Sequence, residues 1–167
     1  TDCPFEAISM VPRKLGKGSD LVANVSASLC ASCGICSASC SQLAIGPADR
    51  NAKTQLEKVK HLKHDFDKTK IAFVYCQSCV ASSRVLGAIS KVVAPFPVEC
   101  SGSVHYGVFS TLLGHFAGVF VLSCPWRACQ NREGVILMKD RLLGERGPKV
   151  GGHFDKDRLH IIEGGLS

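Results

Sequence analysis

Short, continuous apolar runs dominate the middle of the chain. Three of them lie at 71–75, 96–99 and 118–123, and each is too short and too uniformly apolar for an amphipathic helix. Runs of this kind are typical of strands that are buried on both faces of a parallel sheet. We expect a last strand at 158–162. The pattern therefore predicts parallel strands that are neighbours in one sheet.

Segments with helical spacing alternate with these strands. Candidate helices lie at 82–93, 104–116 and about 132–144. In the second of them an apolar residue recurs every four positions, at Val104, Val108, Leu112 and Phe116. Strands that alternate with helices are joined by right-handed crossovers. We therefore predict a small three-layer α/β domain with a parallel sheet over residues 70–167.

A charged segment, residues 49–69, precedes the first strand. Its apolar positions follow spacings of three, three and four, at Leu56, Val59, Leu62 and Phe66. This spacing predicts one amphipathic helix, which we interpret as a linker between two domains. Its lysines are expected to keep one face solvated rather than to form a basic docking site.

Composition favours a folded protein with metal or redox chemistry. The chain has 167 residues, of which 46% are hydrophobic, so it can bury a core. It shows no apolar stretch of about 18 residues and no signal-peptide pattern, and we expect a cytoplasmic location without a membrane span. Ten cysteines in such a chain argue against a disulfide framework. The formal charge of +6 is a weak guide to partners, because bound thiolate clusters would offset it.

Residues 1–48 contain a C-x2-C-x2-C-x3-C run formed by Cys30, Cys33, Cys36 and Cys40. The first three cysteines of such a run wrap a [4Fe-4S] cluster, and in two-cluster ferredoxins the last one binds the other cluster. We therefore predict that Cys3, upstream, completes the set of Cys30, Cys33 and Cys36. Cys40 would bind a different cluster, whose other ligands would precede residue 1. On this interpretation the chain is a fragment of a longer protein.

The segments CPFEAISM (3–10) and CSQLAIGP (40–47) match each other as two halves of a repeat. In each, the cysteine is followed by an Ala-Ile step into an expected short strand, and Ser41 stands where proline is usual. Structural zinc is an alternative, although zinc ribbons pair their C-x2-C knuckles over longer gaps.

These motifs carry a resemblance. Residues 1–48 resemble the second half of a bacterial two-[4Fe-4S] ferredoxin domain. The stretch SLCASCGICSASC, with the QLEKVKHL helix after it, is similar to the C-terminal ferredoxin region found in heterodisulfide reductase. The resemblance implies an α+β ferredoxin-like domain, N-terminally incomplete, with one complete [4Fe-4S] cluster.

Five further cysteines follow the three predicted strands, at Cys76, Cys79, Cys100, Cys124 and Cys129. The carboxyl ends of parallel strands meet at one edge of a sheet, so we expect these five thiols to converge. A cluster needs four ligands, and the two close pairs are favoured with Cys100 as a near neighbour, although the sequence leaves the choice of four open. A thioredoxin-like exchange pair at Cys76 and Cys79 is an alternative, as are buried inert thiols.

The order C-x2-C, then CSG, then C-x4-C followed by REG resembles the delta subunit of methyl-viologen-reducing hydrogenase over about residues 70–163. The resemblance implies a [2Fe-2S] cluster. It also implies electron transfer from a hydrogenase or formate dehydrogenase to heterodisulfide reductase, and some members are fused to the C-terminus of the reductase chain that receives the electrons. Tyr75 and Ser103 stand where the family often has cysteine and arginine.

The sequence thus predicts an electron-transfer module of an oxidoreductase complex, with no substrate site of its own. No catalytic serine, histidine and acid set appears, and none of the six histidines keeps metal-ligand spacing with a cysteine pair. Trp126 is expected to shield a cluster and Arg127 to raise its potential. The implied partners are a flavin-containing core and a donor dehydrogenase, with no nucleic acid. The alternatives are a ferredoxin-linked thiol–disulfide oxidoreductase using Cys76 and Cys79, and a zinc-stabilised scaffold.

Overall fold

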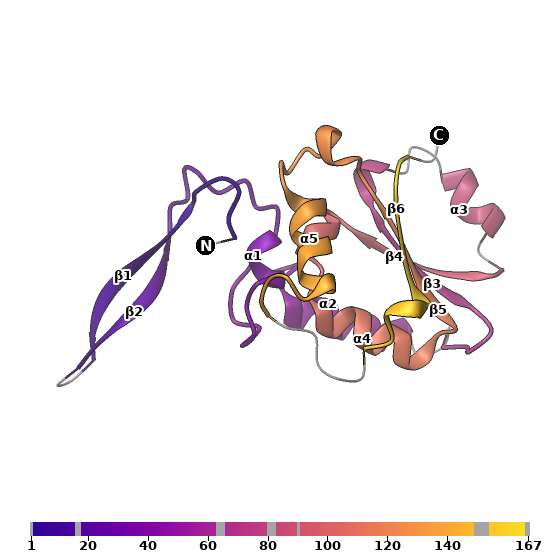
Figure 1. Ribbon diagram of the computed structural model, residues 1–167, viewed down its shortest axis with the longest axis horizontal. Coiled ribbons are helices and arrows are strands. Elements are labelled where there is room, and N and C mark those ends of the chain that lie inside the picture. The colour runs from indigo at the N-terminus through magenta and orange to yellow at the C-terminus, as the bar shows by residue number, and fades with distance from the viewer. Residues whose placement is uncertain are drawn as a thin grey trace.

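The computed structural model combines a projecting two-stranded hairpin with a larger α/β body (Figure 1). It describes residues 2–15, 18–62, 66–79, 83–89, 91–148 and 154–165. The chain is mixed α/β, with one antiparallel and one parallel sheet.

The hairpin pairs β1 (Ile8–Leu15) with β2 (Gly18–Val25) in antiparallel register. It extends away from the body, and the cysteine-rich loop and the short helix α1 (Ile35–Ala38) lie between the two (Figure 1). The first Ala-Ile step leads into β1 as expected. The strand expected after the second step is wrong, because residues 44–48 form no strand. There Gly46 has a φ of 138° and Pro47 lacks the N–H that a strand would use.

The expectation of parallel neighbouring strands is confirmed. The strands are β3 (Ile71–Cys76), β4 (Val93–Val98), β5 (Gly118–Ser123) and β6 (Leu159–Glu163). They pair in the order β4-β3-β5-β6, and all three pairings are parallel. The carboxyl ends of the first three strands therefore lie at one edge, where the loops with five cysteines begin.

Helices cover both faces of this sheet. They are α2 (Ala52–His61), α3 (Ser83–Ile89), α4 (Tyr106–His115) and α5 (Gly134–Leu143). Short 3-10 turns lie at Gln77–Cys79, Ser101–Ser103, Trp126–Ala128 and Lys156–Arg158. The predicted stripe of the second helix is confirmed, since its four apolar residues are all buried. Residues 82 and 90 of the first predicted helix lie outside the described residues.

The two faces of the sheet carry different apolar groups. On one face Val74 and Val121 pack with Phe109 from α4 and Met138 from α5. On the other face Phe73, Tyr75 and Leu122 pack with Leu86 and Ile89 from α3, together with several of the thiols. Apolar burial on both faces explains why the strands are continuous apolar runs rather than alternating ones.

Helix α2 is shorter than the charged segment that predicted it. Its Val59 is fully buried in the main core, and Leu56, Leu62 and Phe66 pack against the same core. The predicted apolar stripe therefore faces the α/β body. Residues 63–65 lie outside the described residues. No described helix combines the length and the hydropathy needed to cross a bilayer.

Candidate metal centres

Four cysteines that the sequence assigns to one cluster line one small cavity. Cys3, Cys30, Cys33 and Cys36 face a space of about 170 Å³. The remaining wall is largely apolar and includes Phe5, Ile8, Val25 and Ile45. We call these four cysteines the first site. Cys40 is not among the described residues that line it.

Backbone conformation brings the first-site thiols together. Ser32 and Gly34 adopt the left-handed region, with φ of 52° and 78°, so the chain turns sharply within the C-x2-C-x2-C run. A Cβ on Gly34 would lie 3.1 Å from the Cβ of Ser103, so this loop also packs closely on the turn after β4. The small residue here fits both the turn and the close approach.

The two halves of the predicted repeat share one local geometry. The backbone N–H of Ala7 donates to the Sγ of Cys3 at 3.3 Å, and that of Ala44 donates to the Sγ of Cys40 at 3.4 Å. In both segments the residue before the alanine has a φ of 55°. Burial acts to raise the pKa of Cys40, but backbone N–H groups from Ala44 and its neighbours outweigh it, so the pKa lies below its usual value.

The first site disfavours four free thiolates. Burial raises the pKa of Cys33, and the nearby Cys3 and Cys30 raise it further. Burial, and then the proximity of Cys33, Cys3 and Cys30, raises the pKa of Cys36 to about 11. A bound cation reverses this balance, because a coordinating thiol gives up its proton. The donor set therefore fits a metal group with thiolate ligands.

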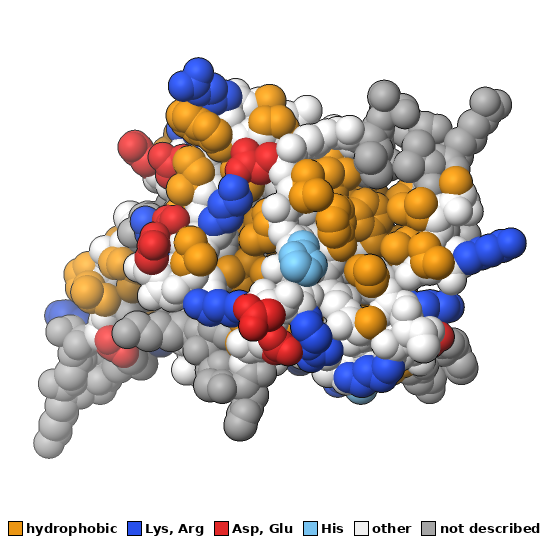
Figure 2. Space-filling view, turned by 45° about the vertical axis from the view of Figure 1, so that its right-hand side comes forward, with side chains coloured by type: hydrophobic (Ala, Val, Ile, Leu, Met, Phe, Trp, Pro, Cys, Tyr) orange, Lys and Arg blue, Asp and Glu red, His pale blue; other side chains and the backbone are white. Residues whose placement is uncertain are grey.

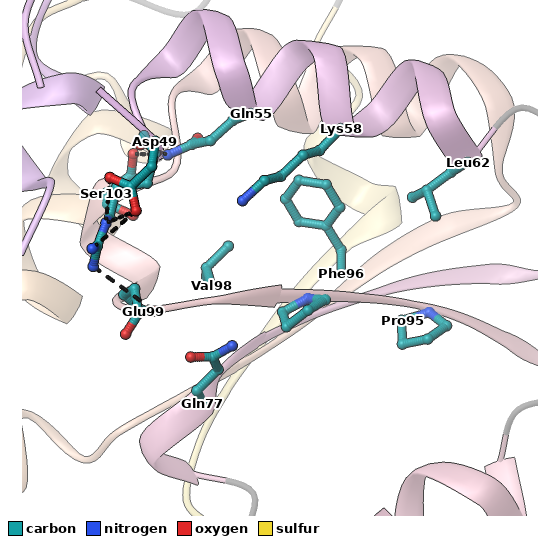
Figure 3. A pocket seen from close by; sticks show the side chains of 12 residues that line it. Asp49, Gln55, Lys58, Leu62, Gln77, Pro95, Phe96, Val98, Glu99 and Ser103 are labelled. Carbon is teal, nitrogen blue, oxygen red and sulfur yellow. Dashed lines mark hydrogen bonds and ion pairs between the residues drawn. The ribbon is translucent and has the colours of Figure 1, made fainter. Parts of the chain in front are cut away.

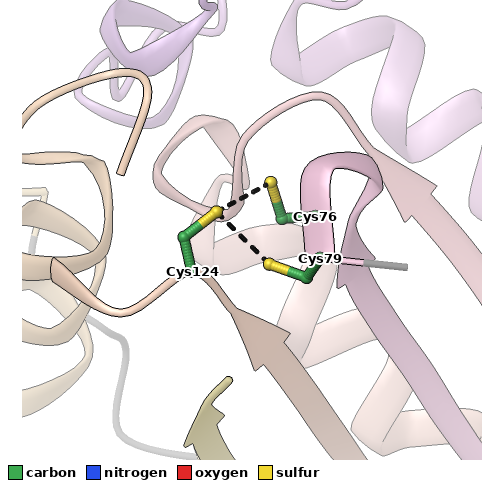
Figure 4. A group of neighbouring side chains, drawn as sticks. All are labelled: Cys76, Cys79 and Cys124. Atoms are coloured by element: carbon green, nitrogen blue, oxygen red, sulfur yellow. Dashed lines mark hydrogen bonds between the residues drawn. The ribbon is translucent and has the colours of Figure 1, made fainter. Parts of the chain in front are cut away.

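Three cysteines at the edge of the parallel sheet form a tight group (Figure 4). The Sγ of Cys124 lies 3.2 Å from that of Cys79 and 3.6 Å from that of Cys76. The ligand atoms of all three lie within 4.8 Å of one another. Cys76 ends β3, Cys79 ends the following turn and Cys124 follows β5. The predicted convergence of the strand ends thus explains the position of the group.

The remaining two cysteines form a hydrogen-bonded pair beside this group. The hydrogen bond to Cys129 and burial together raise the pKa of Cys100. The same bond, despite burial and with help from the backbone N–H groups of Asn131, Gly134 and Val135, lowers the pKa of Cys129 to about 6. We call all five cysteines the second site.

The spacing of the second site fits tetrahedral thiolate coordination. With metal–sulfur bonds of about 2.3 Å, two thiolates on one tetrahedral ion lie about 3.8 Å apart. The observed 3.2 Å and 3.6 Å are close to this value. Burial raises the pKa of Cys79 and of Cys124, so these thiols also need a cation to ionise. The geometry accommodates iron and zinc alike.

The loop that carries the last two cysteines is held by β6. Glu163 accepts a hydrogen bond from the backbone N–H of Trp126 at 3.0 Å and pairs with Lys139 of α5. The Trp126 ring is 52% exposed, and the guanidinium of Arg127 lies over it, 5.2 Å from its centroid. This exposure does not fit the expected role of Trp126 as a shield.

A buried arginine, which sequence analysis missed, ties the two parts of the chain together. Arg141 of α5 is 3% exposed and donates to the carbonyl of Gly102 at 2.9 Å. It also donates to Asp2 at 2.8 Å and to Ser39 at 2.7 Å. Nothing in the sequence marks this residue, because its partners are more than 100 positions away.

No family model matches the chain, and no match was found among curated proteins or solved structures. The interpretation of the sites therefore relies on their own geometry and chemistry.

Two hollows contain no cysteine among the described residues that line them. A groove of about 290 Å³ lies between α2 and β4 and is lined by charged, amide and apolar side chains, including Arg50, Lys58, Gln77 and Glu99 (Figure 3). On the α3 side of the sheet, an apolar hollow of about 430 Å³ is lined by Phe73, Phe120 and their neighbours, and apolar side chains gather on this face (Figure 2). The described residues of neither hollow present an arrangement of groups for catalysis.

Proposed function

We propose that the chain is an iron–sulfur electron-transfer module with two metal centres. Cys3, Cys30, Cys33 and Cys36 would hold a [4Fe-4S] cluster. Cys76, Cys79, Cys124 and one of the second-site pair would hold a [2Fe-2S] cluster. When bound, such clusters accept and donate single electrons. The observation that carries the proposal is the collection of nine free cysteines into two groups, one lining a cavity and one at the sheet edge.

The chain's own residues supply what such centres need. An apolar wall with few polar groups surrounds the first-site thiols and keeps water away from them. The backbone N–H of Ala7 reaches one of their sulfurs. Hydrogen bonds to sulfur and exclusion of solvent are two of the means by which a protein sets the potential of a cluster.

The proposed setting is a larger oxidoreductase complex in the cytoplasm. Its other components would be a flavin-containing core that resembles heterodisulfide reductase and a donor that resembles a hydrogenase or formate dehydrogenase. Support for these partners comes from the two cysteine motifs and their order along the chain. No substrate site is proposed for the chain itself.

Metal analysis combined with electron paramagnetic resonance tests the proposal. We expect about six iron atoms per chain, with matching acid-labile sulfide, and two distinct signals after reduction. A protein that contains zinc and is colourless would refute it. That result would favour a structural scaffold, which the thiol spacing of the second site also accommodates. About four iron atoms and an alkylatable Cys76–Cys79 pair would favour thiol–disulfide exchange instead.

Single replacements identify the fourth ligand of the second site. Backbone N–H groups and the Cys100 thiol all donate to Cys129, as expected for a residue that binds as thiolate. Cys129→Ser should therefore lose the [2Fe-2S] signal. Cys100→Ala should keep this signal but shift its potential, because a hydrogen bond to sulfur is removed. The reverse outcome would assign Cys100 as the ligand.

A further inference from the structure

The two cysteine sites share a buried junction. Ile35, in the loop of the first site, is fully buried with Cys100 and Leu137, which are 2% and 3% exposed. Cys33 of the first site packs against this group. We call Ile35, Cys100, Leu137 and the adjoining Gly134 the junction. Thiols from both sites therefore contact one small apolar cluster.

Gly134, the first residue of α5, is the point of closest approach. A Cβ added to it would lie 2.6 Å from the Sγ of Cys100. The same atom would lie 3.4 Å from the Sγ of Cys129 and 3.4 Å from the Cδ1 of Ile35. The terminal methyl of Ile35 and both sulfurs therefore pack against the same side of a residue that has no side chain.

Other contacts hold this approach in place. A Cβ on Gly102 would lie 2.4 Å from the carbonyl oxygen of Gly134, so the turn after β4 is pressed against the start of α5. Arg141, two turns along α5, binds both Gly102 and the Asp2–Ser39 pair of the first-site region. The junction is thus fixed from both parts of the chain.

We propose that the junction is the path by which electrons pass between the two sites, and that Ile35 and Gly134 are positioning residues for it. The inference rests on the proposed function. In each transfer one electron leaves the reduced site and enters the oxidised one, no bond forms or breaks, and no proton needs to move. Tunnelling slows steeply across empty space and is faster through packed atoms. The Cδ1 of Ile35 fills the space that would otherwise separate the two sites.

Ile35→Val tests the path, because it removes only the Cδ1 that meets Gly134. The matched control is Ile161→Val, which removes the same methyl from a residue of β6 that packs on the main core. The full chain, loaded with iron and sulfide, is mixed with one electron equivalent of dithionite and freeze-quenched, and the signals of the two sites are followed with time. We expect electron redistribution to slow about tenfold in Ile35→Val and to stay unchanged in Ile161→Val.

The outcomes separate the path from the proposed function. A wild-type chain that binds no iron contradicts the proposed function itself. If the wild type loads both sites, redistribution at the wild-type rate in Ile35→Val overturns the path alone. Loss of iron from the first site in Ile35→Val also overturns it, because Ile35 would then serve that site rather than the junction.

A second pair of variants tests the role of Gly134. Gly134→Ala forces the Cys100 sulfur to move, and we expect the signal of the second site to shift in position while that of the first site does not. Gly114→Ala, in α4, is the control, because no described atom lies within 4 Å of a Cβ there. Identical second-site spectra in Gly134→Ala and Gly114→Ala would overturn the close approach on which the path depends.

Discussion

At the scale of single residues, one carboxylate is expected to matter for stability more than its position near the chain end indicates. Asp2 is 13% exposed in its side chain and contacts Arg141, Ser39 and Arg146. Partial burial alone would raise its pKa, but the hydrogen bonds from Arg141 and Ser39 outweigh burial, so the pKa lies below its ordinary value. Asp2 thus compensates a buried guanidinium, beside the cysteine that it precedes.

Asp2→Ala should lower the free energy of unfolding by about 3 kcal/mol at pH 7, because it leaves the buried charge of Arg141 without its partner. Urea unfolding of the wild type and the variant measures the difference. Asp155→Ala is the matched control, since its partner Arg158 is 39% exposed and such pairs contribute less than about 1 kcal/mol. Equal losses in the two variants would contradict the role of Asp2.

The pH dependence of this effect has a defined sign. The folded pKa of Asp2 is depressed, so its contribution is complete above the unfolded value of about 3.9 and is lost as the pH falls through the folded value. The difference between the wild type and Asp2→Ala should therefore stay constant from pH 8 down to about pH 5 and shrink below about pH 4. A difference that grows on acidification would contradict this assignment.

At the scale of elements, α2 is positioned by one capping residue. The side chain of Asn51 accepts a hydrogen bond from the backbone N–H of Thr54 at 3.0 Å and donates to the carbonyl of Ala48 at 3.2 Å. Asn51→Ala should destabilise the chain by about 1 kcal/mol, as measured by thermal or urea unfolding. The control is Glu133→Ala, because Glu133 precedes α5 without a side-chain cap. A cost for Glu133→Ala as large as that for Asn51→Ala would contradict the capping role.

The sequence predicted the elements better than it predicted their contacts. The three buried strands and the stripe of α4 followed from hydrophobic spacing, because burial on both faces leaves a local pattern. The convergence of Cys76, Cys79 and Cys124 followed from the geometry of parallel strands. The absence of a strand after Ile45 was not predicted, although Gly46 and Pro47 mark it in hindsight. The expectation of one long linker helix likewise gave no indication that α2 packs on the main core.

The junction between the sites was out of reach for sequence analysis. Gly134 and Arg141 acquire their roles only from partners far along the chain, such as Cys100 and Asp2. A glycine at a helix start and an arginine within a helix have no periodicity that distinguishes a packed or paired residue from a solvated one. The tertiary contact, and not the local pattern, determines what these residues do.

At the scale of the whole molecule, the two sites draw their ligands from separate stretches of chain. The first-site cysteines lie within residues 3–36 and the second-site cysteines within residues 76–129. The sites touch at the junction, but no described thiol belongs to both. Each is therefore expected to load with metal independently, even though electrons pass between them.

Replacing one ligand in each site tests this independence. Cys36→Ser should remove about four iron atoms per chain and leave the signal of the second site, whereas Cys124→Ser should remove about two and leave the signal of the first. Iron and sulfide quantification with electron paramagnetic resonance on the reduced variants measures both. The reason is that each cluster is completed by thiolates of its own site, so an absent ligand acts locally. Loss of all iron in Cys124→Ser would mean that the first site forms only on a loaded second site.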